Sequence, residues 1–199
     1  MTDLLIATTN AGKLREIVPI LQGTSIFQPG EAGRLLTLAD LADPPPEPEE
    51  TGASFAQNAR LKAEYYAART GLITVAEDSG LVIDALDGRP GIHSARYPGE
   101  TYPDKFANLY KELAPFPRPW KARYFCALQL STGFSCSGVV LGEISPEPRG
   151  TRGFGYDPIF FLPEFNATFG EVDEERKSAV AHRGKAFRKL REYLVLHPL

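Results

Sequence analysis

The stretch from Ser54 to Gly80, SFAQNARLKAEYYAARTGLITVAEDSG, decides the fold. Its first part predicts a helix, because Ser54 and Gln57 have the spacing of a capping box and Gly71 fits the position just past a helix end. The apolar run LITVAED that follows predicts a buried strand. A helix that leads directly into a buried strand indicates an α/β protein.

The rest of the chain continues this alternation. Strands are expected at residues 4–7, 81–86, 121–130 and 134–144, and helices at 13–21, 104–113 and 182–196. The segment STG between the last two strands predicts a hairpin turn. The proline-rich region 29–50 is expected to be a surface loop, and Pro19 is expected to bend or weaken the first helix. The 199 residues therefore predict a single domain, 1–199, with an α/β fold and a mixed sheet.

Composition and charge exclude several classes of protein. The chain has 43% hydrophobic and 24% charged residues, which is typical of a globular protein, and its net charge of −3 gives no broad basic field for nucleic acid. It has neither a signal-peptide pattern nor an apolar stretch near the ~20 residues of a membrane span. Cys126 and Cys136 lack CxxC spacing, so free thiols in a reducing cytosol are expected. The sequence thus predicts a cytoplasmic protein with no nucleic-acid partner and no membrane partner.

The polar loop TTNAGK, from Thr8 to Lys13, joins the first expected strand to the first expected helix. Backbone N–H groups at a helix start form an anion site, and Lys13 adds a positive charge one turn in. The Walker pattern is absent, since Ala7 stands where a glycine is required and Leu14 replaces the Ser or Thr. The loop is therefore either a phosphate site or a polar helix cap with a solvated lysine.

Two adjacent acids, Glu77 and Asp78, end the buried strand of the opening stretch. On a regular strand their side chains point to opposite faces, so only one of them easily faces a given pocket. Asp78 is favoured, because Ser79 and Gly80 are expected to follow it in a turn. A carboxylate there suits holding Mg²⁺, activating a water molecule, or both.

Another acidic pair, Glu49 and Glu50, stands at the end of the proline-rich region. It could bring a second carboxylate to the metal that Asp78 holds. Taken alone, the pair would be a solvated acidic loop, so its role depends on Asp78.

Two further segments carry groups that suit a flat base. In GTRGFGYDP, glycines flank Phe154, and a ring held in this way suits stacking on a base, although it could equally fill the core. Asp157 in the same segment could accept a hydrogen bond from a ligand or from its own loop. In KSAVAHRGKAF, the donors Lys177, His182 and Arg183 lie near a helix start, where the alternative is a basic solvated face. Together with the loop and the acids, these groups specify a ligand with phosphates, a divalent metal and a planar base.

Four segments carry a resemblance to a known family. They are ATTNAGKLREI (7–17), AEDSGLVIDALDGRPGIHSARY (76–97), GFGYDPIF (153–160) and KSAVAHRGKAF (177–187). In this order and spacing they resemble the inosine triphosphate pyrophosphatase family, which acts on non-standard purine nucleoside triphosphates. The resemblance implies an elongated mixed β-sheet flanked by helices, in two lobes with a central active-site cleft. It also implies a homodimer that hydrolyses ITP, dITP and XTP to the monophosphate and pyrophosphate, with Mg²⁺ as cofactor.

The family's functional residues carry over onto the matching positions of this sequence. Asp78 would be the general base and a metal ligand, Lys13 a catalytic residue at the phosphates, and Glu49, with Glu50 as its neighbour, the second metal ligand. The substrate would be bound by Thr8, Thr9, Asn10, Ala11, Gly12, Lys13, Ser79, Phe154, Gly155, Tyr156, Asp157, Lys177, His182 and Arg183. The first six of these would bind the triphosphate, and the last seven would surround the base.

Two positions depart from the family pattern. Glu77 stands where bacterial members usually have aspartate, which keeps the charge and adds a methylene, and Ala181 stands where serine is frequent. Donors such as Arg183 or His182 would select a base with a 6-oxo group over adenine.

A nucleotide-binding regulatory module without turnover is the main alternative function, and a pyrophosphatase for modified pyrimidine triphosphates is another. The presence of both a general base and a metal-linked glutamate favours the enzyme.

Overall fold

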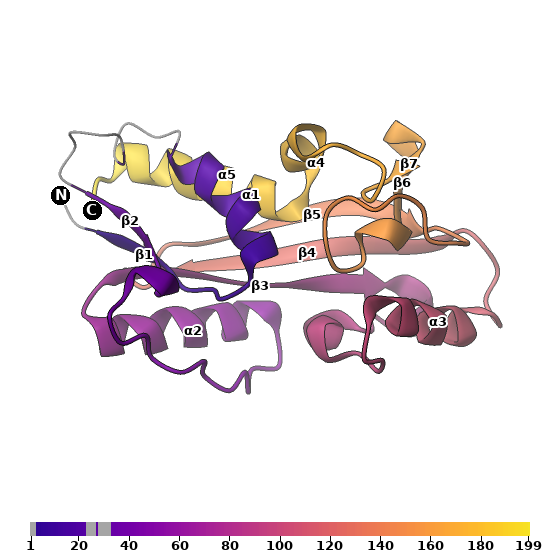
Figure 1. The fold of residues 1–199 in the computed structure, drawn as a ribbon, viewed down its shortest axis with the longest axis horizontal. Coiled ribbons are helices and arrows are strands. Elements are labelled where there is room, and N and C mark those ends of the chain that lie inside the picture. The colour runs from indigo at the N-terminus through magenta and orange to yellow at the C-terminus, as the bar shows by residue number, and fades with distance from the viewer. Residues whose placement is uncertain (1–2, 23–26, 28–32) are drawn as a thin grey trace. The chain divides into compact units, whose positions relative to one another are not determined.

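The protein is described by a computed structural model over residues 3–22, 27 and 33–199 (Figure 1). Its strands are β1 (Leu4–Ile6), β2 (Leu35–Thr37), β3 (Ile73–Ile83), β4 (Trp120–Leu130), β5 (Ser135–Ile144), β6 (Phe160–Leu162) and β7 (Ala167–Thr168). Its helices are α1 (Ala11–Gln22), α2 (Phe55–Thr70), α3 (Tyr102–Leu113), α4 (Glu174–Val180) and α5 (His182–Leu196). Within these described ranges, no helix combines the length and the apolar character needed to cross a membrane.

The strands form one mixed sheet in the order β2-β1-β3-β4-β5-β6-β7. β1 pairs in parallel with β2 and β3, whereas β6 pairs in antiparallel with β5 and β7. The predicted hairpin is present, because β4 and β5 are neighbours in the sheet and the Leu130 N–H donates to the Phe134 carbonyl at the turn between them. A mixed sheet with flanking helices confirms the predicted α/β fold.

Two compact units make up the described chain. Unit 1 contains the described residues up to Asp78 together with 126–138 and 183–199, and unit 2 contains 79–125 and 139–182. β3, β4 and β5 each contribute residues to both units. Each unit has its own buried apolar core.

In unit 1, the alternation of side chains along β1 builds two apolar layers. Leu4 and Ile6 belong to a core with residues of α1 and α5, whereas Leu5 belongs to a core with residues of α2. Figure 1 shows α1 and α5 together on one side of these strands and α2 on the other. Cys126 lies in the first core and Cys136 packs against it, both as free thiols, as the sequence predicts.

The helix α2 begins and ends where the sequence predicts. Ser54 Oγ accepts a hydrogen bond from the Gln57 N–H at 3.2 Å, and Gln57 Oε1 accepts one from the Ala53 N–H at 2.7 Å. These side chains satisfy donors that a helix start leaves without intrahelical partners. Gly71 ends the helix in the left-handed region, with φ of 69°, where glycine meets no steric penalty. α1 also forms as expected and continues through Pro19.

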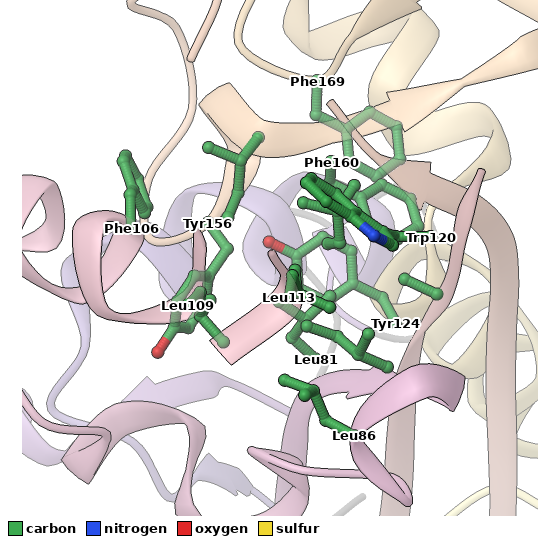
Figure 2. Packing of buried hydrophobic residues seen from close by; sticks show 14 of the residues in the cluster. Leu81, Leu86, Phe106, Leu109, Leu113, Trp120, Tyr124, Tyr156, Phe160 and Phe169 are labelled. Atoms are coloured by element: carbon green, nitrogen blue, oxygen red, sulfur yellow. The ribbon is translucent and has the colours of Figure 1, made fainter. Parts of the chain in front are cut away.

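Unit 2 is built around aromatic rings (Figure 2). The ring centroids of Tyr124 and Phe160 lie 4.4 Å apart, and those of Phe160 and Phe169 lie 5.3 Å apart. Tyr156, which the sequence predicts to bind substrate, is buried in this core and packs against Phe106. The core therefore anchors the segment before β6, which carries the predicted base-binding residues.

The structure of β3 differs from the prediction. The sequence predicts a turn at Ser79 and Gly80 between two extended pieces, but β3 is one continuous strand that contains both residues. β3 lies between β1 and β4 in the sheet, so strand pairing holds its backbone extended and overrides the turn preference of these residues. Asp84–Leu86, expected to be extended, form a 3₁₀ turn instead.

The predicted surface loop over 29–50 is also wrong in part. Residues 29–32 lie outside the described residues. Leu35–Thr37 form β2, which pairs in parallel with β1, and Leu38–Asp40 form a 3₁₀ turn. Pairing with a buried neighbouring strand orders this short segment, a long-range effect that the local composition does not reveal.

Candidate active site

The loop after β1 forms the start of α1. Asn10 Oδ1 accepts a hydrogen bond from the Lys13 N–H at 3.1 Å, and Thr8 Oγ1 accepts one from the Asn10 N–H at 3.2 Å. Asn10 therefore caps the helix. Thr9, Asn10 and Ala11 are exposed, so the positive end of the helix dipole is accessible to an anion. The loop is thus a polar cap whose exposed face suits a phosphate.

Glu77 lies in a cluster of charges with residues of α1 and α5. Its Oε1 atom is 2.8 Å from Lys13 Nζ and 3.3 Å from Arg183 Nε, and Arg183 also donates from Nη1 to Glu16 Oε2 at 2.5 Å. Burial raises the pKa of Glu77, but the charges of Lys13, Arg183 and Lys62 outweigh burial and hold this pKa well below its ordinary value. Glu77 therefore stays ionised, and Lys13 is ion-paired rather than solvated.

Asp78 faces α2, on the other side of the strand. Its Oδ2 accepts a hydrogen bond from Asn58 Nδ2 at 3.0 Å, and its Oδ1 lies 3.6 Å from Lys62 Nζ. Burial raises the pKa of Asp78, Lys62 and Asn58 lower it, and the carboxylates of Glu50 and Glu77 raise it again. The net result is a pKa above the ordinary value for aspartate.

The two adjacent acids thus have pKa values that are shifted in opposite directions. Such a separation is a common sign of different roles in acid–base chemistry. Asp78 has the environment of a group that takes up a proton, whereas Glu77 has that of a fixed counter-ion. The prediction that the two side chains point to opposite faces is confirmed. The prediction that they end the strand is wrong, because β3 continues to Ile83.

A divalent metal fits the chemistry of the Asp78 side. Among residues 3–22, 27 and 33–199, no three His, Cys, Asp or Glu side chains gather as a metal site. Mg²⁺, however, is commonly held by one or two carboxylates plus the phosphates of a substrate. Asp78 and Glu50 could supply these carboxylates, since both lie near Lys62 Nζ, which is 2.5 Å from Glu50 Oε1 and 3.6 Å from Asp78 Oδ1. Glu49, the predicted ligand, is exposed, and its role stays a prediction.

Sequence reasoning missed Asn58 and Lys62. Both are buried on α2, on the same stripe as Ala59, Ala63 and Tyr66. The sequence does carry a signal for these two residues, because two polar side chains at positions i and i+4 interrupt an apolar helix face. A lysine on such a face would be expected to have a buried partner, since lysine is almost never buried without one.

In unit 2, Asp157 organises the glycine-rich loop. Its Oδ2 accepts hydrogen bonds from the Phe154 N–H at 2.7 Å and from Lys177 Nζ at 2.6 Å. Gly153 has φ of +74°, and a Cβ there would lie 2.1 Å from Asp157 Oδ2. Only glycine fits this position, so the loop conformation depends on it. The predicted bond of Asp157 to its own loop is present, and its binding of a ligand stays a prediction.

Aromatic contacts bring the other predicted base-binding residues of unit 2 together. Lys177 Nζ lies 4.9 Å from the centre of the Phe154 ring, and the His182 ring stacks on Tyr124 with 4.6 Å between centroids. Tyr124, which sequence reasoning did not select, also donates a hydrogen bond to Asp157 Oδ1 at 3.5 Å. Unit 2 therefore collects a flat ring, a cation and an imidazole around one carboxylate. Arg183 belongs to unit 1, in the cluster around Glu77.

Known proteins identify the family of this chain. The sequence profile of the Ham1 family matches residues 4–193. This chain belongs to the Ham1 family. The dITP/XTP pyrophosphatase of Geobacter sulfurreducens is 47% identical to this Ham1-family chain over 201 residues, which cover 98% of the chain and 97% of that relative. The dITP/XTP pyrophosphatase of Geobacillus kaustophilus is 43% identical, with 96% and 94% covered.

Solved structures of Ham1-family proteins have the same fold. A HAM1 protein from Coxiella burnetii matches with a TM-score of 0.87 and 35% identity, over 98% of this chain and all 100% of that one. The Ham1 protein of Staphylococcus aureus matches with a TM-score of 0.83 and 32% identity, over 97% and 98%. These matches confirm the family resemblance that four sequence segments carry.

Proposed function

We propose that this Ham1-family chain is a nucleoside-triphosphate pyrophosphatase that hydrolyses ITP, dITP and XTP to the monophosphate and pyrophosphate. The curated relatives named above are dITP/XTP pyrophosphatases, which supports the enzyme class and the substrate class. The observation that carries the proposal is the adjacent carboxylate pair of β3. A proton acceptor on one face and a fixed anion that holds Lys13 and Arg183 on the other suit hydrolysis of a highly charged phosphoanhydride.

In the proposed reaction, Asp78 takes a proton from a water molecule as the water oxygen forms a bond to the α-phosphorus. The bond between the α-phosphorus and the bridging oxygen breaks, and pyrophosphate leaves with the electron pair. Lys13 gives one N–H donor to Glu77 and has three in all, so it can also bind a phosphate oxygen. The N–H groups at the start of α1 take up further negative charge on the phosphates.

The metal is a second part of the proposal. Asp78 would hold Mg²⁺ together with Glu50 or Glu49, and when bound the ion neutralises charge on the phosphate oxygens. The paired arrangement of Asp78 and Glu50 around Lys62 supports Glu50 as the second ligand. A homodimer and a cytoplasmic location remain predictions from the sequence.

Release of pyrophosphate from a panel of triphosphates tests the function. We expect ITP, dITP and XTP to be hydrolysed with kcat/KM at least about 10²-fold above that for ATP, because polar pairing to a 6-oxo group rejects the adenine amine. Removing Mg²⁺ with EDTA should abolish pyrophosphate release, and adding it back should restore the rate. Equal turnover of ATP and ITP would contradict the proposed specificity. Substrate binding without any pyrophosphate release would instead favour the regulatory module, and preferred turnover of modified pyrimidine triphosphates would favour the other alternative.

Phe154→Ala tests the proposed contact with the base. We expect KM for ITP to rise by about 5- to 100-fold, since stacking of a base on an aromatic ring contributes about 1–3 kcal/mol. The exposed ring of Phe116 offers a matched control, and Phe116→Ala should leave KM unchanged. Steady-state kinetics of both variants decide the point, and an unchanged KM for Phe154→Ala would remove this residue from the base site.

A further inference from the structure

The side-chain amide of Asn58, on the buried face of α2, is bonded at both ends. It is 0% exposed. Its Oδ1 accepts a hydrogen bond from the Gly52 N–H at 2.8 Å, and its Nδ2 donates to Asp78 Oδ2 at 3.0 Å. The orientation of the amide follows from its partners, because a backbone N–H only donates and an ionised carboxylate only accepts.

Gly52 approaches α2 so closely that a Cβ at this position would have to displace its neighbours. A Cβ at this position would lie 2.5 Å from Asn58 Oδ1 and 2.8 Å from Gln57 Cβ. The segment that carries Glu50 is therefore held directly against the start of α2, with Asn58 as the contact.

Lys62 makes a parallel link one helical turn further along. Its Nζ lies 2.5 Å from Glu50 Oε1 and 3.6 Å from Asp78 Oδ1. Asn58 and Lys62 thus contact different oxygens of Asp78, and each also contacts the segment 50–52. One helix face therefore sets the position of this segment relative to the carboxylate.

We propose that Asn58 is a positioning residue for the hydrolytic reaction, which fixes the Asp78 carboxylate and the segment 50–52 in one arrangement; this inference rests on the function proposed above. A carboxylate that accepts a proton from water must present one oxygen in a defined direction, and a misplacement of about 1 Å can cost about 10²-fold in rate. The hydrogen bond from Asn58 holds Oδ2 and so prevents rotation of the carboxylate. Asn58 acts through Asp78 and takes no part in bond making.

Two substitutions of Asn58 separate its two hydrogen bonds. Asn58→Asp keeps the acceptor for the Gly52 N–H but places an oxygen against Asp78, whereas Asn58→Leu removes both bonds at similar volume. We expect both to lower kcat for ITP by about 10- to 100-fold, with KM changed by less than about threefold, because the substrate contacts remain and the reacting geometry is lost.

Gly52→Ala perturbs the same amide from the other side. The added methyl group would displace Asn58 Oδ1, so kcat should fall in this variant as well. In a background that already carries Asn58→Leu, the further loss of kcat from Gly52→Ala should largely disappear, since residues that act through one contact are not additive. If Asn58→Leu is unfolded at the assay temperature, the values of kcat for Gly52→Ala and Asn58→Asp test the proposal instead.

Gln57→Ala is the matched control. It removes the hydrogen bond from the Ala53 N–H at the same helix start but touches neither Asp78 nor Gly52 through a hydrogen bond. We expect a lower Tm and an unchanged kcat. If the Asn58 variants and Gly52→Ala lose Tm but keep the wild-type kcat, as this control does, the positioning role is overturned and the proposed function stands. If the wild-type protein releases no pyrophosphate from any triphosphate, both are overturned.

Discussion

Asp78→Asn is expected to lower kcat for pyrophosphate release by about 10²- to 10⁴-fold, which is the usual contribution of a general base. The amide has nearly the shape of the carboxylate but cannot take a proton from water. Burial raises the pKa of Asp78, and its neighbours on α2 only partly offset this, which favours uptake of a proton. At saturating Mg²⁺, which Asp78 is also proposed to hold, the expected loss is in turnover, because the other proposed substrate contacts lie on other residues.

The fold of this variant should persist. The amide oxygen of the new side chain can still accept the hydrogen bond from Asn58 Nδ2, so we expect Tm to change by a few degrees at most. Steady-state kinetics and a thermal melt on the same preparation measure both quantities. Near wild-type turnover in a folded Asp78→Asn variant would eliminate the general-base role.

Glu77→Gln is expected to act on stability instead. It removes the negative charge that pairs with Lys13 and Arg183, where Glu77 is 4% and Arg183 is 2% exposed. Breaking one partner of a buried ion pair leaves an uncompensated charge, which typically costs about 3–5 kcal/mol of the free energy of unfolding. Arg183 retains its contact with Glu16, but Lys13 has no other ion pair among the described residues.

Urea unfolding of Glu77→Gln measures this loss. The control is Glu64→Gln, which removes one partner of the exposed Arg60–Glu64 pair on α2 and should cost less than about 1 kcal/mol. Equal unfolding midpoints for the two variants would show that the cluster around Glu77 contributes nothing particular to stability.

Local signals in the sequence were enough to predict most helices and strands. Ser54, Gln57 and Gly71 mark the ends of α2 through hydrogen bonds and backbone conformation that span only a few residues. β2 and the continuity of β3 could not be read in the same way. Both depend on pairing with strands from distant parts of the chain, and such pairing overrides the turn preference of Ser79 and Gly80.

In the candidate site, too, local sequence signals indicated some features, whereas contacts between distant residues were not apparent. Residue type and position singled out Asp78, Lys13 and Asp157 as candidates, and the alternation along a strand correctly placed the two acids on opposite faces. The partners were not apparent, because Arg183 reaches Glu77 across 106 positions of sequence and Asn58 reaches Asp78 across 20. The positions of Asn58 and Lys62 on an otherwise apolar face of α2 mark them as unusual, but their partner Asp78 is evident only from the packed structure.

The placement of Glu77 and Asp78 on consecutive residues of β3 has a consequence for how such a sequence can diverge. The strand admits no insertion or deletion between them, since a shift of one position would send each side chain to the wrong face. We expect substitution of Glu77 to change chiefly how much folded protein a cell holds, and substitution of Asp78 to change chiefly how fast each molecule works. Natural selection would then act on abundance and on turnover through two neighbouring codons.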